Sequence, residues 1–163
     1  MRIIRGHRGE VSSLWFHPDG RHLLSGAWDE TVKVWDIDAG ACLRMLKARA
    51  HPVARRAPCV DPRHVLSLGT NGTVRMWDIE TGQAVLSLDG LDTIATHPDG
   101  KRLLAGARAG GLSLWDLSSG ACVKTLKGHV WPVEAIIVHH DGRRALLGAR
   151  DGTLQVWDLD TGV

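Results

Sequence analysis

Three residues near the N-terminus have the side chains of a hydrolase triad, and the chain is also rich in histidine. His7, Ser25 and Asp29 could supply a general base, a nucleophile and an orienting carboxylate if the fold brought them together. The nine histidines could likewise suggest metal binding. Which chemistry is available depends on the elements that position these residues, and the repeats of the chain identify those elements.

Internal periodicity is the clearest feature of the sequence. Four of the seven tryptophans precede an aspartate, at spacings of 42, 38 and 42 residues. These four are Trp35, Trp77, Trp115 and Trp157. A glycine follows each of them by five positions, and the motif His-Pro-Asp-Gly, or His-His-Asp-Gly, begins at His17, His97 and His139. The sequence therefore predicts four repeats of one structural unit.

Each repeat is predicted to form four short antiparallel strands. In the first repeat these are expected at residues 11–16, 22–27, 31–35 and 42–46. Pairs such as Asn71-Gly72 and Asp151-Gly152 supply the positive φ that tight hairpins need. Apolar residues lie on both faces of the strands, which implies sheets stacked between neighbouring sheets, as in a propeller. The predicted fold class is all-β.

These motifs resemble the WD40-repeat family over essentially the whole chain, which implies a β-propeller with four blades of four antiparallel strands per chain. In that family a hydrogen-bonded tetrad joins a loop His, a strand Ser or Thr, a turn Asp and the Trp of the Trp-Asp pair. The first repeat matches the tetrad with His7, Ser25, Asp29 and Trp35. The later repeats match it in part, with Ser67, Asn71 and Trp77, then Trp115, then His129, Asp151 and Trp157.

The later repeats depart from this pattern at identifiable positions. Arg49 replaces the histidine of the second repeat, Ala105 and Ala109 replace the serine and aspartate of the third, and Leu147 replaces the serine of the fourth. Without these polar groups, the second and third blades are expected to be held together by apolar packing more than by the tetrad.

The resemblance also changes the meaning of the residues that could do chemistry. His7, Ser25 and Asp29 would already be committed to anchoring a tryptophan, so no catalytic residue is expected. His17, His97 and His139 occupy one turn position in separate repeats, which favours turn or surface roles over metal binding. The glycines fall at turns with the repeat period, not in a phosphate-binding loop. We expect no enzymatic activity, metal or cofactor.

Charge and composition limit the class of partner. The 20 Lys and Arg against 18 Asp and Glu give a net charge of +2, and no basic run exceeds two residues. Nucleic acid and anionic membranes both favour clustered positive charge, so neither is expected as the main partner. There is no long apolar run of the kind that targets or spans a membrane, and a cytoplasmic protein is expected. The three cysteines form no CxxC pair, which argues against a disulfide framework.

The resemblance implies that loops on one propeller face bind a protein or peptide partner. On this sequence that face comprises Glu10, Ser12, Trp28, Pro52, Ala54, Thr70, Asp92, Arg108, Trp131, Pro132, Glu134 and Arg150. Trp28 and Trp131 lie outside the Trp-Asp positions, and Trp with Arg is typical of binding hot spots, although either Trp could simply cover a blade edge. The expected function is a non-catalytic protein-interaction scaffold. The alternative is a propeller that binds a small ligand, or catalyses a reaction, at its central channel.

The division of the chain into repeats leads to an expectation about assembly. A single domain over residues 1–163 would contain an N-terminal strand at 1–5 and blades at about 6–46, 47–88, 89–126 and 127–163. The N-terminal strand aligns with the fourth strand of a blade, which the last blade lacks. We therefore expect a homodimer with two-fold symmetry that closes an eight-bladed ring by exchanging this strand. A closed four-bladed monomer and a piece of a longer propeller are the alternatives.

Overall fold

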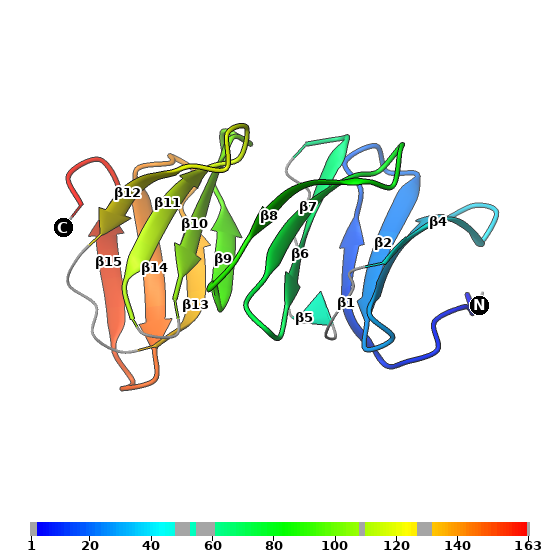
Figure 1. The fold of residues 1–163 in the computed structure, drawn as a ribbon, viewed down its shortest axis with the longest axis horizontal. Coiled ribbons are helices and arrows are strands. Elements are labelled where there is room, and N and C mark those ends of the chain that lie inside the picture. The colour runs from blue at the N-terminus through cyan, green and yellow to red at the C-terminus, as the bar shows by residue number, and fades with distance from the viewer. Residues whose placement is uncertain (1–2, 48–52, 55–60, 108–109, 127–131, 163) are drawn as a thin grey trace. The chain divides into compact units, whose positions relative to one another are not determined.

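The structure is a computed structural model, and it describes residues 3–47, 53–54, 61–107, 110–126 and 132–162 (Figure 1). Every regular element in this part of the chain is a β-strand, and no helix long and apolar enough to cross a membrane occurs there. Fifteen strands form four antiparallel sheets, which confirms the predicted all-β fold class. The chain divides into two compact units, residues 1–87 and 88–163, and each is described by itself.

The first sheet of the N-terminal unit contains the first repeat, with its strands in sequence order. They are β1 (Val11–Phe16), β2 (His22–Ala27), β3 (Thr31–Asp36) and β4 (Ala41–Lys47). The register places Leu24 of β2 opposite Val34 of β3, and Ser25 opposite Lys33. Because neighbouring residues of a strand point to opposite faces, Leu24 and Ser25 lie on different sides of the sheet. One side is aliphatic, and the other carries the serine and the tryptophan of the tetrad.

The second sheet of this unit contains the second repeat. Its strands are β5 (Val53–Ala54), β6 (His64–Gly69), β7 (Val74–Asp78) and β8 (Ala84–Leu88), again in sequence order. A shared core joins the two sheets and consists of Leu24, Val32, Val34, Leu46, Val65 and Trp77. The indole of the second repeat therefore packs against the aliphatic side of the first sheet, and burial of these side chains supplies the main stabilising free energy.

The C-terminal unit repeats this arrangement with the last two repeats (Figure 1). Its first sheet contains β9 (Thr93–Thr96), β10 (Arg102–Gly106), β11 (Leu112–Asp116) and β12 (Cys122–Leu126). Its second sheet contains three strands, β13 (Val133–Val138), β14 (Arg144–Ala149) and β15 (Leu154–Asp158). Their common core includes Leu104, Leu112 and Leu114 from the first of these sheets, and Ile136, Leu147 and Trp157 from the second.

Two predicted details of the strands need comment. The last sheet has three strands in the described residues. Residues 3–5, from the segment expected to form the N-terminal strand, adopt no regular structure. Whether that segment pairs with another chain stays a prediction, and so do the predicted blade boundaries.

Tight turns join the strands, and one of them carries an unusual residue. In the β2–β3 turn Glu30 has a φ of 63°, a backbone angle that residues with a Cβ rarely adopt. The aligned positions of the other three repeats are Gly72, Gly110 and Gly152, with φ between 80° and 84°. The turn therefore requires a left-handed residue, and the first repeat alone meets that requirement without glycine.

Candidate functional site

The first repeat contains a continuous chain of hydrogen bonds behind its tryptophan. The indole Nε1 of Trp35 donates to the hydroxyl of Ser25 at 2.7 Å, and that hydroxyl lies 2.6 Å from Nε2 of His7. Nδ1 of His7 in turn lies 3.0 Å from a carboxylate oxygen of Asp29. Loop, strand and turn residues that are far apart in sequence are thus joined, and Trp35 is only 4% exposed.

The carboxylate at the end of this chain is held by several donors. Burial opposes ionisation of Asp29, but hydrogen bonds from the Thr31 hydroxyl, the Arg8 amide and His7 outweigh it and hold the pKa of Asp29 well below its usual range. The Thr31 hydroxyl donates at 2.6 Å and the Arg8 amide at 2.8 Å. Asp29 therefore stays ionised at neutral pH and fixes the N-terminal loop to the β2–β3 turn.

The network cannot act as a hydrolase triad in this geometry. Ser25 is only 3% exposed, and its oxygen already accepts the indole proton of Trp35. A nucleophilic serine needs access to the substrate carbonyl and an oxygen free to attack. The contacts of His7, Ser25 and Asp29 instead satisfy one another's buried polar groups.

The other tryptophans find hydrogen-bond partners in two different ways. Trp77 donates to the Ser67 hydroxyl at 2.8 Å, which is the arrangement of the first repeat. Trp115 donates to the Ser113 hydroxyl at 2.7 Å and Trp157 to the side-chain oxygen Oε1 of Gln155 at 3.0 Å, so both use the side chain of a residue two positions earlier on their own strand. These partners replace the strand serine where the third and fourth repeats have an alanine and a leucine.

The turn residues of the later tetrads have local partners. Asn71 accepts the amide of Thr73 at 3.1 Å, and Asp151 accepts both the amide and the hydroxyl of Thr153, at 3.0 and 2.7 Å. His129, predicted to complete the fourth tetrad, lies outside the described residues, as does Arg49 of the second repeat.

The described contacts of the predicted binding face in the N-terminal unit involve Glu10, Ser12 and Trp28. The Trp28 side chain is 57% exposed, and its amide donates to the Glu10 carbonyl at 2.9 Å. The Ser12 hydroxyl donates to the Gly26 carbonyl at 3.2 Å, so it also serves its own sheet. A Cβ added to Gly9 would lie 2.6 Å from the backbone nitrogen of Asp29, which makes glycine necessary there. The loops thus meet closely while the indole of Trp28 remains in solvent.

The described contacts of this face in the C-terminal unit involve Asp92, Glu134 and Arg150. Arg150 forms an ion pair with Glu134, with the two side chains 70% and 50% exposed. The hydrogen bond that Arg150 donates to this carboxylate is the main reason that the pKa of Arg150 is raised, and the charge of Asp92 adds to it. Arg108 and Trp131, and the predicted Pro52, lie outside the described residues, and only the backbone of Ala54 is described.

Comparison with known proteins agrees with this architecture. The profile of the family "WD domain, G-beta repeat" matches residues 1–36 and 120–158. The chain is 34% identical over 142 residues to "Nuclear distribution protein PAC1" of Coccidioides posadasii, covering 78% of this chain and 30% of that protein. It is 29% identical over 129 residues to "Periodic tryptophan protein 2 homolog" of Schizosaccharomyces pombe, covering 79% and 11%.

A shorter match is closer in sequence. The chain is 49% identical over 43 residues to "WD repeat-containing protein 18" of Bos taurus, covering 26% of this chain and 10% of that protein. The chain therefore spans between a tenth and a third of the length of the relatives it matches. The Trp-Asp repeats, the four antiparallel sheets and these matches together show that the chain belongs to the WD40-repeat family.

Proposed function

We propose that this chain is a non-catalytic protein-interaction scaffold that binds a protein or peptide partner. The proposed contacts are the β2–β3 turn, which carries Trp28, and, in the C-terminal unit, the start of β13 and the β14–β15 turn, which carry Glu134 and Arg150. The observation that carries the proposal is the exposure of Trp28, whose indole is accessible to solvent although the backbone of its loop is held in place. The amide of Trp28 and the close approach of Gly9 hold the backbone of that loop. A rigid aromatic side chain loses little entropy on binding, which is why Trp is enriched at hot spots.

The charged pair in the C-terminal unit supports the same role. Arg150 and Glu134 are both largely exposed, so they remain accessible to a partner. An exposed pair of this kind contributes little to stability, because solvent screens it and the side chains lose freedom. A partner carboxylate could instead compete with Glu134 for the guanidinium of Arg150, which would give the interaction a charge preference.

Affinity capture from the host tests the proposal if variants are compared side by side. Trp28→Ala and Arg150→Glu should each deplete the same captured partner, whereas Arg21→Glu should leave its recovery unchanged. Arg21 is exposed and lies at the other end of β2, so it controls for a change of charge alone. Capture of one partner by all three variants at the wild-type level would contradict this binding site.

Self-association is a second part of the proposal, and it rests on the apolar side of the last sheet. Leu24, Val32 and Val34 of the first sheet are at most 2% exposed, because the second sheet covers them. The aligned residues of the last sheet are Leu146, Leu154 and Val156, with exposures of 42%, 79% and 65%. Exposed apolar area of this kind marks an interaction surface.

The first sheet exposes the complementary side. Leu14 is 62% exposed and Phe16 75% exposed, whereas Ile136, aligned with Leu14, is 7% exposed in the core of the C-terminal unit. In that unit, the side bearing Ile136 packs on the aliphatic side of the neighbouring sheet. The first sheet of one copy therefore offers the side that fits the last sheet of a second copy, which supports the homodimer.

Light scattering after gel filtration tests this part. A mass of two 17.7 kDa chains supports the dimer, and the mass of one chain contradicts it. In the second case the exposed apolar side of the last sheet would be covered by a further blade instead of a second copy. Leu14→Asp and Val156→Asp should each yield monomer, since each places a charge in the proposed contact. Val85→Asp is the matched control, because Val85 is 50% exposed on the outer strand β8 and lies outside that contact.

A further inference from the structure

The β1–β2 turn gathers two imidazoles around one carboxylate. His17, Asp19 and His22 each offer a donor atom, and these atoms all lie within 4.8 Å of one another. Nδ1 of His22 lies 2.6 Å from Oδ2 of Asp19, and Nδ1 of His17 lies 2.9 Å from the same oxygen. Two imidazole nitrogens and a carboxylate oxygen form a donor set that suits Zn²⁺ and similar divalent transition ions.

The backbone of the turn fixes the carboxylate of Asp19. Its Oδ1 accepts the amides of Arg21 and His22 at 2.8 and 3.1 Å, which turns Oδ2 toward the two imidazoles. Gly20 makes this turn possible through its positive φ of 70°. The carboxylate is thus oriented before any ion arrives, so little conformational freedom is lost on binding.

The imidazole of His17 is oriented in the way that metal-bound histidines are. Its Nε2 lies 2.6 Å from the carbonyl oxygen of Pro62, which can only accept, so Nε2 carries the proton. In the neutral ring Nδ1 is then an acceptor: it accepts the backbone amide of Asp19 at 3.3 Å and lies 2.9 Å from Oδ2 of the same residue. A cation bound between Nδ1 and Oδ2 would offset the repulsion between these two acceptors. A carbonyl partner on the remote ring nitrogen is the usual outer contact of a histidine ligand.

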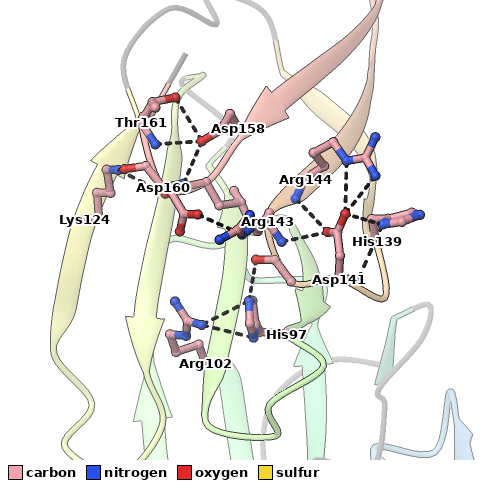
Figure 2. A network of polar contacts seen from close by, with 12 residues as sticks. His97, Arg102, Lys124, His139, Asp141, Arg143, Arg144, Asp158, Asp160 and Thr161 are labelled. Carbon is pink, nitrogen blue, oxygen red and sulfur yellow. Dashed lines mark hydrogen bonds and ion pairs between the residues drawn. The ribbon is translucent and has the colours of Figure 1, made fainter.

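In two other turns of the same form, an arginine side chain contacts the aligned aspartate. In the fourth repeat Nε and Nη2 of Arg144 donate to Oδ2 of Asp141 at 3.1 and 2.8 Å, beside His139 (Figure 2). In the third repeat Nε of Arg102 donates to Asp99 at 2.7 Å. The residue of the first repeat that aligns with these arginines is His22. An imidazole, which can bind a metal ion, therefore lies beside the carboxylate where the other two repeats have a guanidinium.

We propose that His17, Asp19 and His22 form a binding site for a divalent transition ion such as Zn²⁺. Nδ1 of each histidine and Oδ2 of Asp19 would bind the ion, and the proton on Nδ1 of His22 would leave to solvent. Ligand atoms around tetrahedral Zn²⁺ lie roughly 3.3 Å apart, so each imidazole nitrogen has to move a little away from Oδ2 of Asp19. Asp19 and His22 are about one-third exposed, which gives the ion a path from solvent.

Alignment of the repeats hides this site, because it places His17 with His97 and His139. Its actual neighbour is His22, five residues later and across the turn. His17 is also 7% exposed and hydrogen-bonded to the next repeat, where a surface or turn role was expected. The spacing His-x-Asp-x-x-His carries the signal once the turn is placed between two strands.

Calorimetric titration with ZnCl2 tests the site, using protein alkylated at its cysteines so that thiols do not contribute. His22→Arg should bind one equivalent fewer than the wild type, and it introduces the residue that the third and fourth repeats already accommodate. Arg102→His should bind one equivalent more, because His97 also donates to a carbonyl, that of Gly142 at 2.7 Å. Comparison between variants removes any contribution common to all of them, such as that of Asp61 and His64.

Long-range ¹H–¹⁵N NMR of the imidazoles locates the bound ion. Addition of Zn²⁺ should shift the Nδ1 resonances of His17 and His22 in the wild type and leave that of His140 unchanged. If the wild type and His22→Arg bind equal numbers of equivalents, or if Zn²⁺ leaves the resonances of His17 and His22 unmoved, the proposal is overturned.

Discussion

The indole nitrogen of Trp115 lies 2.7 Å from the hydroxyl of Ser113, two residues earlier on the same strand. That hydroxyl lies 3.4 Å from the Ala105 carbonyl, to which it donates. In the first repeat the strand opposite supplies the indole partner, Ser25. The third repeat therefore provides a hydrogen-bond acceptor for its tryptophan outside the tetrad, although its sequence lacks the strand serine.

Ser113→Ala should lower the free energy of unfolding by about 1 kcal/mol, because the indole N–H of Trp115 would lose its acceptor in a partly buried position. Urea denaturation followed by tryptophan fluorescence measures this change. Ala105→Ser in the same background should restore part of the loss, since residue 105 lies opposite residue 113 in the register. Equal stability of Ser113→Ala and the wild type would show that the bond contributes nothing.

His7→Ala and Asp29→Ala should each lower the free energy of unfolding by about 1 to 3 kcal/mol, because each leaves a buried polar group without its partner. The two residues contact each other directly, so the double variant should lose less than the sum of the single losses. Chemical denaturation of the three variants tests this. Additive losses would mean that the two side chains do not act as one network.

The stability of the N-terminal unit should depend on Asp29 in acid. Its pKa is lower in the folded chain than in the unfolded chain, so the ionised form stabilises the fold at pH above the ordinary value of about 4. As the pH falls from there toward the folded pKa, this contribution is lost. Asp29→Asn should therefore be less stable than the wild type at neutral pH, and the difference should shrink between pH 4 and pH 2. A difference that stays constant over this range contradicts the assignment.

Glu30→Gly should stabilise the chain by up to about 1 kcal/mol, because it removes the steric cost of a left-handed residue with a Cβ. The turn itself should not change, since three repeats already form it with glycine. Thermal unfolding provides the measurement. Gly152→Ala is the reciprocal control and should destabilise, as its φ is 84°. A loss of stability in Glu30→Gly would mean that the Glu30 side chain has a stabilising contact of its own.

Much of the fold follows from the sequence because its turn chemistry recurs. Asp-Gly pairs and Trp-Asp pairs at a fixed period mark the strands of the first repeat to within one residue of their observed ends. What the sequence did not reveal depends on register and packing. The pairing of Trp115 with Ser113 and of Trp157 with Gln155 follows from which side chains share a face, and repeat alignment alone does not reveal it.

Burial was predicted less well than strand position. Cysteine is among the residue types most often buried, yet Cys42 and Cys122 are both exposed. They lie on β4 and β12, the edge strands of their sheets, where one edge of the strand pairs with no other strand in the described residues. The same limit applies to Ser12, a predicted partner contact whose hydroxyl bonds to its own sheet. Position in a repeat fixes the strand, but the layers around it decide exposure.

The affinity of the purified chain for its captured partner tests the central claim most directly. Trp28→Ala should weaken binding by roughly 30-fold, the loss expected when a hot-spot tryptophan is truncated. Arg150→Glu should also weaken binding, and its effect should be larger at low salt than at high salt. The affinity of Arg21→Glu should stay within about twofold of that of the wild type. Unchanged affinity in both Trp28→Ala and Arg150→Glu would contradict the claim that these loops bind the partner.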